Sequence, residues 1–497
     1  MKSRLLLSCF LLLSSGIFAQ GKLRIYDCEN QNLLQEEVVL DSLDLRERLA
    51  TILAERQQQG YLSAFFKSTS ADSLSYCIEN GTRYKWLSLR FHPNITGDWL
   101  RTLGYKSRYF DDRVVNPAQL DQLCSGLLRL AENEGFPFAR LFFDSLEIDS
   151  QQVSVFLRLE RGPEIRYAGV RLAGDASLSE RFLRNYLQLN TGQLYRQKHI
   201  DQISRRLAAL PYLTESEAAR IYFINDKAEI YLYTQKQRAN NFDGMLGVFP
   251  NSTNNKLLLT GDVNLQLWSV FKQGEQLGFN FRSLQPGTQD LKIKLSWPFL
   301  FQTPLGVDAD FSLFKRDSTF LEIQSKLGLQ YLLNGADWFR AFVESRRYNL
   351  LTSLRQPGFA NVGGNLFGLE YQRFRLDRAL NPRRGYRYLI GAGAGEREVA
   401  AFEGTAAIRL SQYQLKAEGE AYWPWKTRWI AVFELNSRFL VTDQLYQNEL
   451  YRLGGFKTLK GFDEMSVNAS QYVFLNVEQR FLLDSGSWLY VFWNGVG

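Results

Sequence analysis

The sequence predicts a protein in two parts: a front half of small α+β modules with the order β-α-α-β-β, and a second half that forms an all-β antiparallel transmembrane barrel. Short stretches of helical periodicity alternate with strand-like segments from residue 20 to about residue 237. From about Phe242 onward, apolar residues recur at every second position, with polar residues between them. Aromatic residues make up 14% of the chain, which suits a wall in which only alternate side chains touch lipid.

Residues 1–19 have the pattern of a secretory signal peptide. Lys2 and Arg4 precede a short apolar run, and the small residue Ala19 stands before the polar Gln20. We expect cleavage after Ala19. Cys9 faintly resembles a lipoprotein box, but the apolar run before it is too short, so plain cleavage is favoured.

Beyond this leader the sequence has no run of about 18 consecutive apolar residues, which excludes membrane-spanning helices. The net charge of +7 could suggest a nucleic-acid partner. The basic residues are dispersed, however, and many alternate with apolar residues inside strands. Anionic lipid headgroups are the better counter-charge, and we expect no nucleic acid.

Three cysteines remain after removal of the leader: Cys28, Cys77 and Cys124. Export implies an oxidising compartment, in which disulfides persist. Cys28 and Cys77 lie in strand-like segments of the same predicted module and could pair, whereas Cys124 lies on the apolar face of a predicted helix. The alternatives are a Cys28–Cys77 disulfide and buried free thiols.

The front half is predicted to hold three modules, because similar units recur at roughly 75 residues, the scale of a small domain. We place them at 20–82, which is the most divergent, at 83–162 and at 163–237. One layer of helices on a small sheet is the economical way to bury their apolar stripes.

Helix starts support this division. In the second module, Asn116 is the expected cap and Pro117 the first helical residue. In the third, Ser177 is followed three residues later by Glu180, which predicts a capping box.

Residues 238–497 are predicted to form the barrel. In its clearest stretch, one face carries Leu321, Ile323, Leu327, Leu329 and Tyr331, and the other carries Glu322, Gln324, Lys326 and Gln330. A soluble β-sandwich also alternates, but its strands are mostly about five or six residues long, whereas many segments here run to about ten residues or more. Trp residues near segment ends match the aromatic girdle of a transmembrane barrel: Trp268, Trp297, Trp338, Trp423, Trp425, Trp429 and Trp488.

Connection lengths give an independent check. If the first strand starts from modules in the periplasm, connections after even-numbered strands are periplasmic and should be short, and those after odd-numbered strands should be longer. The segments from Asn349 to Gly363 and from Thr442 to Ser470 are long connections of the second kind.

Two local patterns in the barrel, together with the three modules, resemble the BamA/TamA family of outer-membrane assembly factors. The first contains Asp377, Pro382, Arg384 and Gly385, which our strand count places at a periplasmic turn. The second contains Gly454, Gly455, Lys460, Gly461 and Phe462, inside the long connection after about the eleventh strand. The resemblance implies that the modules are polypeptide-transport-associated (POTRA) modules and that the second pattern folds back into the barrel lumen.

Two residues depart from the family pattern. Lys460 stands where the family usually has Arg, and lysine cannot make the planar two-pronged contact of a guanidinium. Asn494 stands near the usual position of an Asp. We expect Lys460 to point into the lumen toward Glu478, with Asn494 nearby as a second possible partner. The alternative is a lysine in an ordinary surface loop.

We count about thirteen strands, whereas the family pattern implies about sixteen and a terminal aromatic residue. Because Gly497 ends a strand abruptly, we expect the sequence to be a fragment that lacks roughly the last three strands.

Catalytic chemistry is not predicted. The chain has only two histidines, His92 and His199, and neither belongs to a plausible catalytic triad or metal cluster. Gly391, Gly393 and Gly395 lie within a strand pattern, where small residues relieve crowding. We therefore expect no enzyme activity, no cofactor and no metal.

The resemblance implies a factor in the bacterial outer membrane, with its POTRA modules in the periplasm. Its expected partners are unfolded outer-membrane β-barrel clients and outer-membrane lipid, and a periplasmic or inner-membrane accessory subunit is a further candidate. It would insert clients into the membrane, or move passengers across it, by strand templating and without nucleotide. The alternatives are a secretion pore for one dedicated exported partner and, from another class, a passive porin or outer-membrane enzyme.

Overall fold

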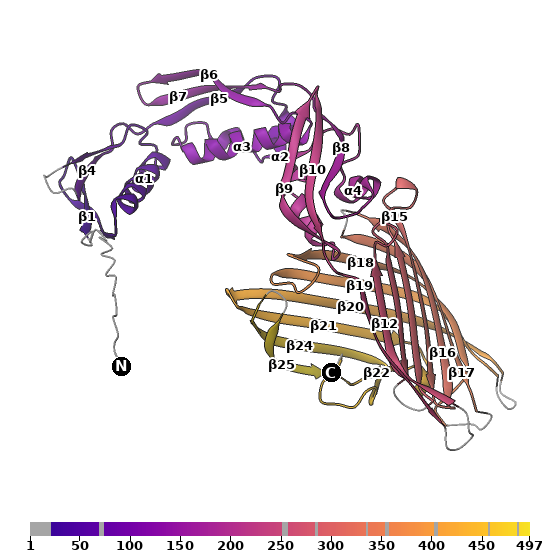
Figure 1. Cartoon of the computed structure of the whole chain (residues 1–497). Coiled ribbons are helices and arrows are strands. Elements are labelled where there is room, and N and C mark those ends of the chain that lie inside the picture. The colour runs from indigo at the N-terminus through magenta and orange to yellow at the C-terminus, as the bar shows by residue number, and fades with distance from the viewer. Residues whose placement is uncertain are drawn as a thin grey trace, which may run out of the picture. The chain divides into compact units, whose positions relative to one another are not determined.

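The computed structural model describes residues 21–68, 74–250, 257–283, 287–333, 336–352, 357–401, 406–455, 458–484 and 487–497. The predicted signal peptide at 1–19 lies outside these residues. The chain forms two compact units, one up to Glu164 and one from Ile165 to Gly497 (Figure 1). Across the described ranges, no helix is long and apolar enough to cross a bilayer.

The first sheet of the front half departs from the predicted β-α-α-β-β order. Its elements are β1 (Gly21–Asp27), β2 (Leu33–Val39), α1 (Ser42–Gln58), β3 (Phe65–Ser68) and β4 (Ser75–Glu79), and the strands lie in the order β2-β1-β4-β3. The stretch before α1 holds two strands instead of one because a turn closed by the Asp27 N–H donating to the Asn32 carbonyl folds β2 back onto β1. The buried cluster is small and consists of Leu23, Ile25, Val39, Ile52 and Ile78.

The second sheet follows the predicted order. Its elements are β5 (Lys85–Phe91), α2 (Gly97–Thr102), η1 (Ser107–Tyr109), α3 (Pro117–Asn133), β6 (Arg140–Asp149) and β7 (Gln152–Glu160). The strands lie in the order β5-β7-β6, so β6 is an edge strand. The predicted cap is confirmed, since the Asn116 side chain accepts from the Gln119 N–H at 3.2 Å and Pro117 begins the helix.

The third sheet lies in the second unit. Its elements are β8 (Arg166–Gly174), α4 (Glu180–Leu187), α5 (Gln197–Ile200), α6 (Ile203–Ala208), β9 (Leu213–Ile224) and β10 (Lys227–Lys236), with strand order β8-β10-β9. The predicted cap Ser177 is wrong. Ser179 directly precedes the helix and its hydroxyl accepts from the Phe182 N–H at 3.1 Å, because α4 begins two residues later than the capping-box pattern suggested.

The described residues after Asn241 form one antiparallel sheet of 13 strands, as predicted, that curves around a lumen (Figure 1). The strands, in order, are β11 (Asn241–Pro250), β12 (Leu257–Trp268), β13 (Gln276–Ser283), β14 (Gln289–Trp297), β15 (Leu305–Arg316), β16 (Phe320–Leu332), β17 (Trp338–Leu350), β18 (Val362–Leu376), β19 (Gly385–Val399), β20 (Ile408–Lys426), β21 (Trp429–Val441), β24 (Gln471–Leu482) and β25 (Trp488–Val496). Two short strands, β22 (Tyr451–Leu453) and β23 (Val467–Ala469), form a hairpin inside the connection from β21 to β24. Two 3-10 helices, η2 (Leu300–Gln302) and η3 (Gln447–Glu449), lie in connections.

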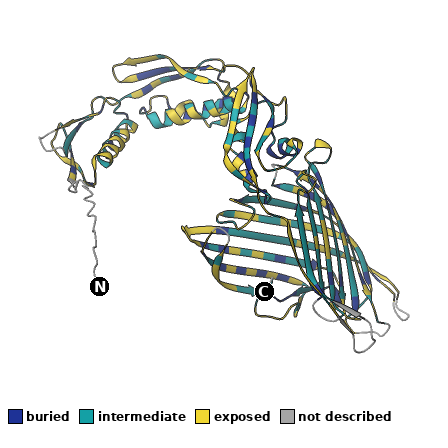
Figure 2. Cartoon of the chain, viewed as in Figure 1, coloured by how far each residue is buried: buried dark blue, intermediate teal, exposed yellow. Residues whose placement is uncertain are grey.

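The strand faces differ as the alternation predicts. On β16, Leu327, Leu329 and Tyr331 point outward and are about half exposed, while Gln330 is buried on the other face. Figure 2 shows buried and exposed residues alternating along the strands of this sheet. An exposed outer face of this length and apolarity suits hydrocarbon as its solvent.

The tryptophans do not all join the outer band. Trp423 and Trp425 are 69% and 54% exposed on the outside. Trp268 and Trp338 instead line the interior cavity, and Trp488 packs on an interior cluster that contains Val432. The girdle prediction is therefore right for some of the seven and wrong for these three.

The third module packs against one end of the barrel, within the same unit. The Ala379 N–H, in the turn after β18, donates to the Ala208 carbonyl of α6 at 2.9 Å. The Gln188 amide, after α4, donates to the Leu333 carbonyl in the turn after β16 at 2.6 Å. The Phe182 ring lies 5.8 Å from that of Phe299. We call this end of the barrel the module end.

Candidate functional site: a loop inside the barrel

The connection between β21 and β24, residues 442–470, crosses the lumen, and we call it the lumen loop. Its described residues contact strands on several sides of the barrel. The contacts are Arg397 with Glu449, Arg452 with Glu322, Gln414 with Tyr451, Arg282 with Glu464 and Lys460 with Glu478. The loop is therefore fastened to β13, β16, β19, β20 and β24, as a structural part of the interior.

A buried ion pair holds the start of the loop. The Arg397 guanidinium meets the Glu449 carboxylate in two parallel contacts of 2.8 and 2.9 Å, and the two residues are 2% and 5% exposed. Next to it, the fully buried Asn448 donates to the Ala360 carbonyl at 2.8 Å, which joins the loop to the connection between β17 and β18. A two-pronged pair out of water fixes direction as well as distance.

The motif region of the loop is held by backbone geometry that only glycine tolerates. Gly454 and Gly455 have φ of +119° and +91°, and a Cβ would lie 2.1 Å from the Asp463 carbonyl oxygen at the first position and 2.2 Å from the Glu464 side chain at the second. The Thr458 hydroxyl donates to the Gly454 carbonyl at 2.8 Å. This close approach is the physical reason for two consecutive glycines.

The structure brings Lys460 and Glu478 together in the lumen. The Lys460 ammonium lies 3.1 Å from the Glu478 carboxylate, and the Arg480 guanidinium lies 2.6 Å from the other oxygen of that carboxylate. Lys460 also lies over the ring of Phe492 at 4.4 Å. The Tyr490 ring lies 5.1 Å from the same ammonium. Lys460 therefore acts as a point charge that contacts the Glu478 carboxylate and two aromatic rings.

The other motif residues have distinct environments. Asn494 pairs with Asn476 across β24 and β25, and its amide nitrogen is buried without a hydrogen-bond partner among the described residues. Phe462 is 56% exposed, and Gly461 has a φ of +95° with open space where a Cβ would be.

The turn between β18 and β19 is organised by Asp377. Its carboxylate accepts from the N–H groups of Arg383 and Arg384 at 2.9 and 3.2 Å. Gly385 has a φ of +109°, and a Cβ there would lie 2.0 Å from the Arg375 carbonyl oxygen. Pro382 lies within the turn, which is the same turn that contacts Ala208 of the third module.

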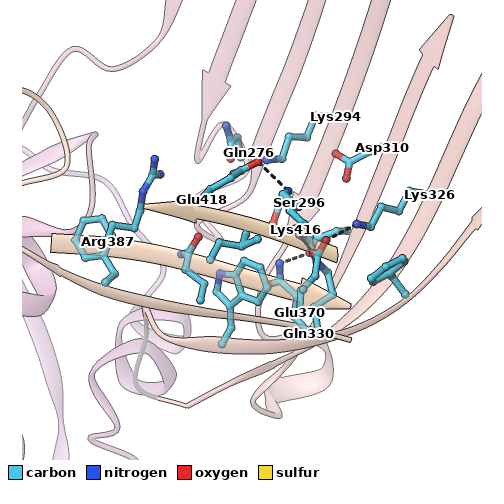
Figure 3. Close-up of a pocket in the computed structure, with 18 of the residues that line it drawn as sticks. Gln276, Lys294, Ser296, Asp310, Lys326, Gln330, Glu370, Arg387, Lys416 and Glu418 are labelled. Atoms are coloured by element: carbon cyan, nitrogen blue, oxygen red, sulfur yellow. Dashed lines mark hydrogen bonds and ion pairs between the residues drawn. The ribbon is translucent and has the colours of Figure 1, made fainter. Parts of the chain in front are cut away.

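Below the loop, the interior wall carries a second charged cluster. The Lys326 ammonium lies 2.6 Å from the Glu370 carboxylate. The Arg340 guanidinium bridges two carboxylates: its Nε donates to Glu370 at 2.8 Å, and its Nη1 lies 3.0 Å from Asp308. Figure 3 shows Lys326 and Glu370 pointing toward one another, from β16 and β18, which flank β17 in the sheet. These groups line a cavity of about 1070 Å³. Side chains of the third module, among them Phe182, Tyr186 and Tyr212, line it at the module end.

Sequence reasoning missed Arg397, Glu449, Arg452 and Glu322. The available signal was the charge of these four residues. Arg397 and Glu322 also lie on the polar face of a predicted strand. Nothing in the pattern indicated which partner the loop would supply, because the paired residues are 52 and 130 positions apart.

Of the two alternatives for Cys28 and Cys77, the structure shows the disulfide, in the first module. Cys28 and Cys77 form a disulfide with a Cα–Cα distance of 5.0 Å, which joins the end of β1 to β4. Cys124 has a free thiol whose pKa is raised to about 11, chiefly by burial.

No family model matches the chain, and no curated protein matches its sequence. Solved structures do resemble it. CdiB from Acinetobacter baumannii is 11% identical with a TM-score of 0.51, over 91% of this chain and 88% of that one. CdiB from Escherichia coli is 14% identical with a TM-score of 0.49, over 89% and 84%. BamA from Haemophilus ducreyi lacking POTRA domains 1-3 is 12% identical with a TM-score of 0.39, over 83% and 87%.

The likeness to CdiB from Acinetobacter confirms the predicted class of fold, POTRA-type modules followed by an outer-membrane β-barrel. The chain has the fold of this CdiB structure.

Proposed function

We propose that this chain is an outer-membrane assembly factor that inserts client β-barrel proteins, or moves passengers across the membrane, by offering strand edges to unfolded clients and without nucleotide. The observation that carries the proposal is the combination of POTRA-type modules with a barrel whose lumen is crossed by an ion-paired loop. A passive porin needs neither. Burying the apolar band of a client in lipid is downhill, so no nucleotide is required.

In this proposal, the module end of the barrel faces the periplasm and the far end faces outward. The modules precede the barrel in the chain, and the third contacts the turns after β16 and β18. Those turns are compact, whereas the lumen loop and the connection between β17 and β18 belong to the opposite end, as expected for outer-membrane barrels.

The second module offers an edge on which a client strand can pair. β6 is an edge strand, and Phe143, Leu146 and Ile148 on it are more than half exposed. Leu146 and Ile148 pair with the buried Val155 and Val153, so they extend the apolar face of the sheet past its edge. A client adds main-chain hydrogen bonds there regardless of sequence and places alternate apolar side chains against this row.

Reconstitution tests the proposal. The full chain is placed in liposomes and given an urea-denatured client barrel, and folded client is measured by its heat-dependent gel migration. We expect insertion faster than in empty liposomes and unchanged by ATP. Replacing Leu146 and Ile148 with Lys should slow insertion, while Leu87→Lys on the opposite edge strand β5, also exposed, should not.

Depletion in the native cell separates the alternatives. Reduced abundance of several outer-membrane barrels supports the assembly factor. Normal abundance of every barrel with loss of one exported protein from the medium would refute it in favour of a dedicated secretion pore.

A further inference from the structure

Arg373 points to the outside of the barrel near the module end. It pairs with Tyr388 between β18 and β19, while its neighbours Gln372 and Phe374 line the interior cavity. Successive side chains of a strand point to opposite faces, so Arg373 lies on the outer face with Tyr371. It lies three residues before the end of β18 at Leu376.

Three tyrosines surround this arginine. Tyr371 lies 6.0 Å from Tyr388, and Tyr388 stacks on Tyr386 at 6.2 Å. Tyr386, Tyr371 and Tyr388 are the phenol groups that interact electrostatically with the Arg373 guanidinium. We call Arg373 and these tyrosines the outer Arg-Tyr cluster.

The cluster holds a hydrogen-bond donor without an acceptor. Arg373 Nε is buried and has no hydrogen-bond partner among the described residues. The Asp337 carboxylate attracts Arg373 electrostatically, after the nearby tyrosines. Arg375, two residues on and on the same face, is by contrast fully engaged: its guanidinium meets the Asp337 carboxylate at 2.8 and 2.7 Å. A buried donor with no partner is costly, which argues for an acceptor that the chain itself does not supply.

The depth of the cluster suits the lipid headgroups. Trp423 and Trp425 mark the same end of the barrel on the outside, where aromatic residues lie at the membrane interface. An outward arginine costs about 2–4 kcal/mol at the membrane midplane but about 0–1 kcal/mol near the interface.

We propose that the outer Arg-Tyr cluster binds the phosphate of a phospholipid in the membrane leaflet at the module end. A guanidinium presents only donors, phenol hydroxyls can donate beside it, and a phosphate diester supplies only acceptors, so the two match in charge and in planar geometry. The acyl chains then lie along the exposed Leu369 and Phe367 on the same face of β18. The inference rests on the proposed placement in the membrane, and it does not depend on client insertion.

Native mass spectrometry of the full chain in detergent tests this site. Phosphatidylglycerol is titrated in and retained lipid is counted. Arg373→Gln should weaken retention about tenfold, which corresponds to about 1.4 kcal/mol. The matched control is Arg347→Gln, since Arg347 is exposed on the outer face of β17 at the far end of the barrel, paired with Ile323. It should retain lipid as the unchanged protein does. Folded gel migration is checked for both variants.

A second variant keeps the rings and removes only hydroxyls. Tyr386→Phe combined with Tyr388→Phe should weaken retention severalfold. If Arg373→Gln retains as much lipid as the unchanged chain, the site is overturned. The same holds if Arg347→Gln loses as much lipid as Arg373→Gln.

Two further probes define the ligand. Diacylglycerol held as tightly as phosphatidylglycerol overturns phosphate recognition, and displacement of the lipid by millimolar inorganic phosphate overturns the assignment to a lipid. Failure of client insertion with lipid retention intact refutes the proposed function alone.

Discussion

Glu478 joins the lumen loop to the barrel wall through two cations. Lys460 and Arg480 both contact its carboxylate, and the three side chains are 14%, 14% and 7% exposed in the order Lys460, Arg480, Glu478. Breaking a buried ion pair by removing one partner costs about 3–5 kcal/mol, because a charge is left uncompensated. Glu478→Ala should therefore lower the free energy of unfolding by about 3 kcal/mol in urea titrations followed by Trp fluorescence.

Glu398→Ala is the control for this prediction. Glu398 pairs with Arg409, but the two side chains are 50% and 77% exposed, and exposed pairs contribute about 0–1 kcal/mol. Equal destabilisation by the two variants would mean that the Glu478 contacts add nothing through burial.

His199 makes the third module sensitive to acid. Burial, followed by the nearby Arg206 and Arg196, lowers its pKa from 6.5 to about 4. The unfolded chain therefore binds a proton at a higher pH than the folded one. The stability contribution is fully present above about pH 6.5 and is lost as the pH falls toward 4.

Hydrogen exchange of the β8 and β10 amides in the full chain measures this effect. We expect protection to fall between pH 6.5 and 4.5 after correction for intrinsic exchange, and His199→Gln to flatten that fall. His92→Gln, in the other unit of the chain, should leave the profile of the third module unchanged. An unaltered profile in His199→Gln would assign the acid sensitivity elsewhere.

Among the elements, the lumen loop depends on glycine geometry. Gly454 and Gly461 both have positive φ, but only at Gly454 would a Cβ meet backbone, at 2.1 Å. Gly454→Ala should thus displace the hairpin of β22 and β23, whereas Gly461→Ala adds only the strain of its φ. Limited proteolysis measures the difference, and we expect cleavage within the loop at least several times faster for Gly454→Ala. Similar rates would show that the close approach to Asp463 does not hold the loop.

The sequence predicted the elements whose pattern is local. The period of two defined the barrel, and Asn116 with Pro117 marked the start of α3. The prediction failed where two local patterns compete. Ser177 and Ser179 both precede acidic and apolar residues, so the position of the first helical turn determines which serine caps the helix.

Long-range pairing set the limit of prediction for the site. Alternation gives the face of a charged residue but not its partner. Lys460 was matched with Glu478 because a resemblance supplied the path of the loop, whereas Arg397 and Glu449 carried no such hint. Trp338 has the same local context as a girdle residue, and only the register of β17 shows that it faces the cavity.

At the scale of the whole molecule, the third module lines the interior at the module end, and the lumen loop crosses it. Phe182, Tyr186 and Tyr212 of the third module line the cavity together with the charged wall. Gly274, in the turn after β12, has no room for a side chain, because a Cβ would lie 2.2 Å from the Phe182 ring. The third module and the barrel thus fit closely at this end of the lumen.

A crosslink at that contact distinguishes insertion along the wall from passage through the lumen. Ala208 and Ala379 are joined by a backbone hydrogen bond of 2.9 Å, so we expect cysteines placed at both positions to form a disulfide. In a Cys124→Ser background, we expect the doubly substituted chain to crosslink under oxidation and to show a shifted band on a non-reducing gel. Because the outer wall stays free, client insertion in liposomes should remain within about twofold of the reduced sample, a difference of about 0.4 kcal/mol. Each single substitution serves as control. If client insertion stops on oxidation of the doubly substituted chain and returns on reduction, the third module must move away from the barrel for insertion to occur.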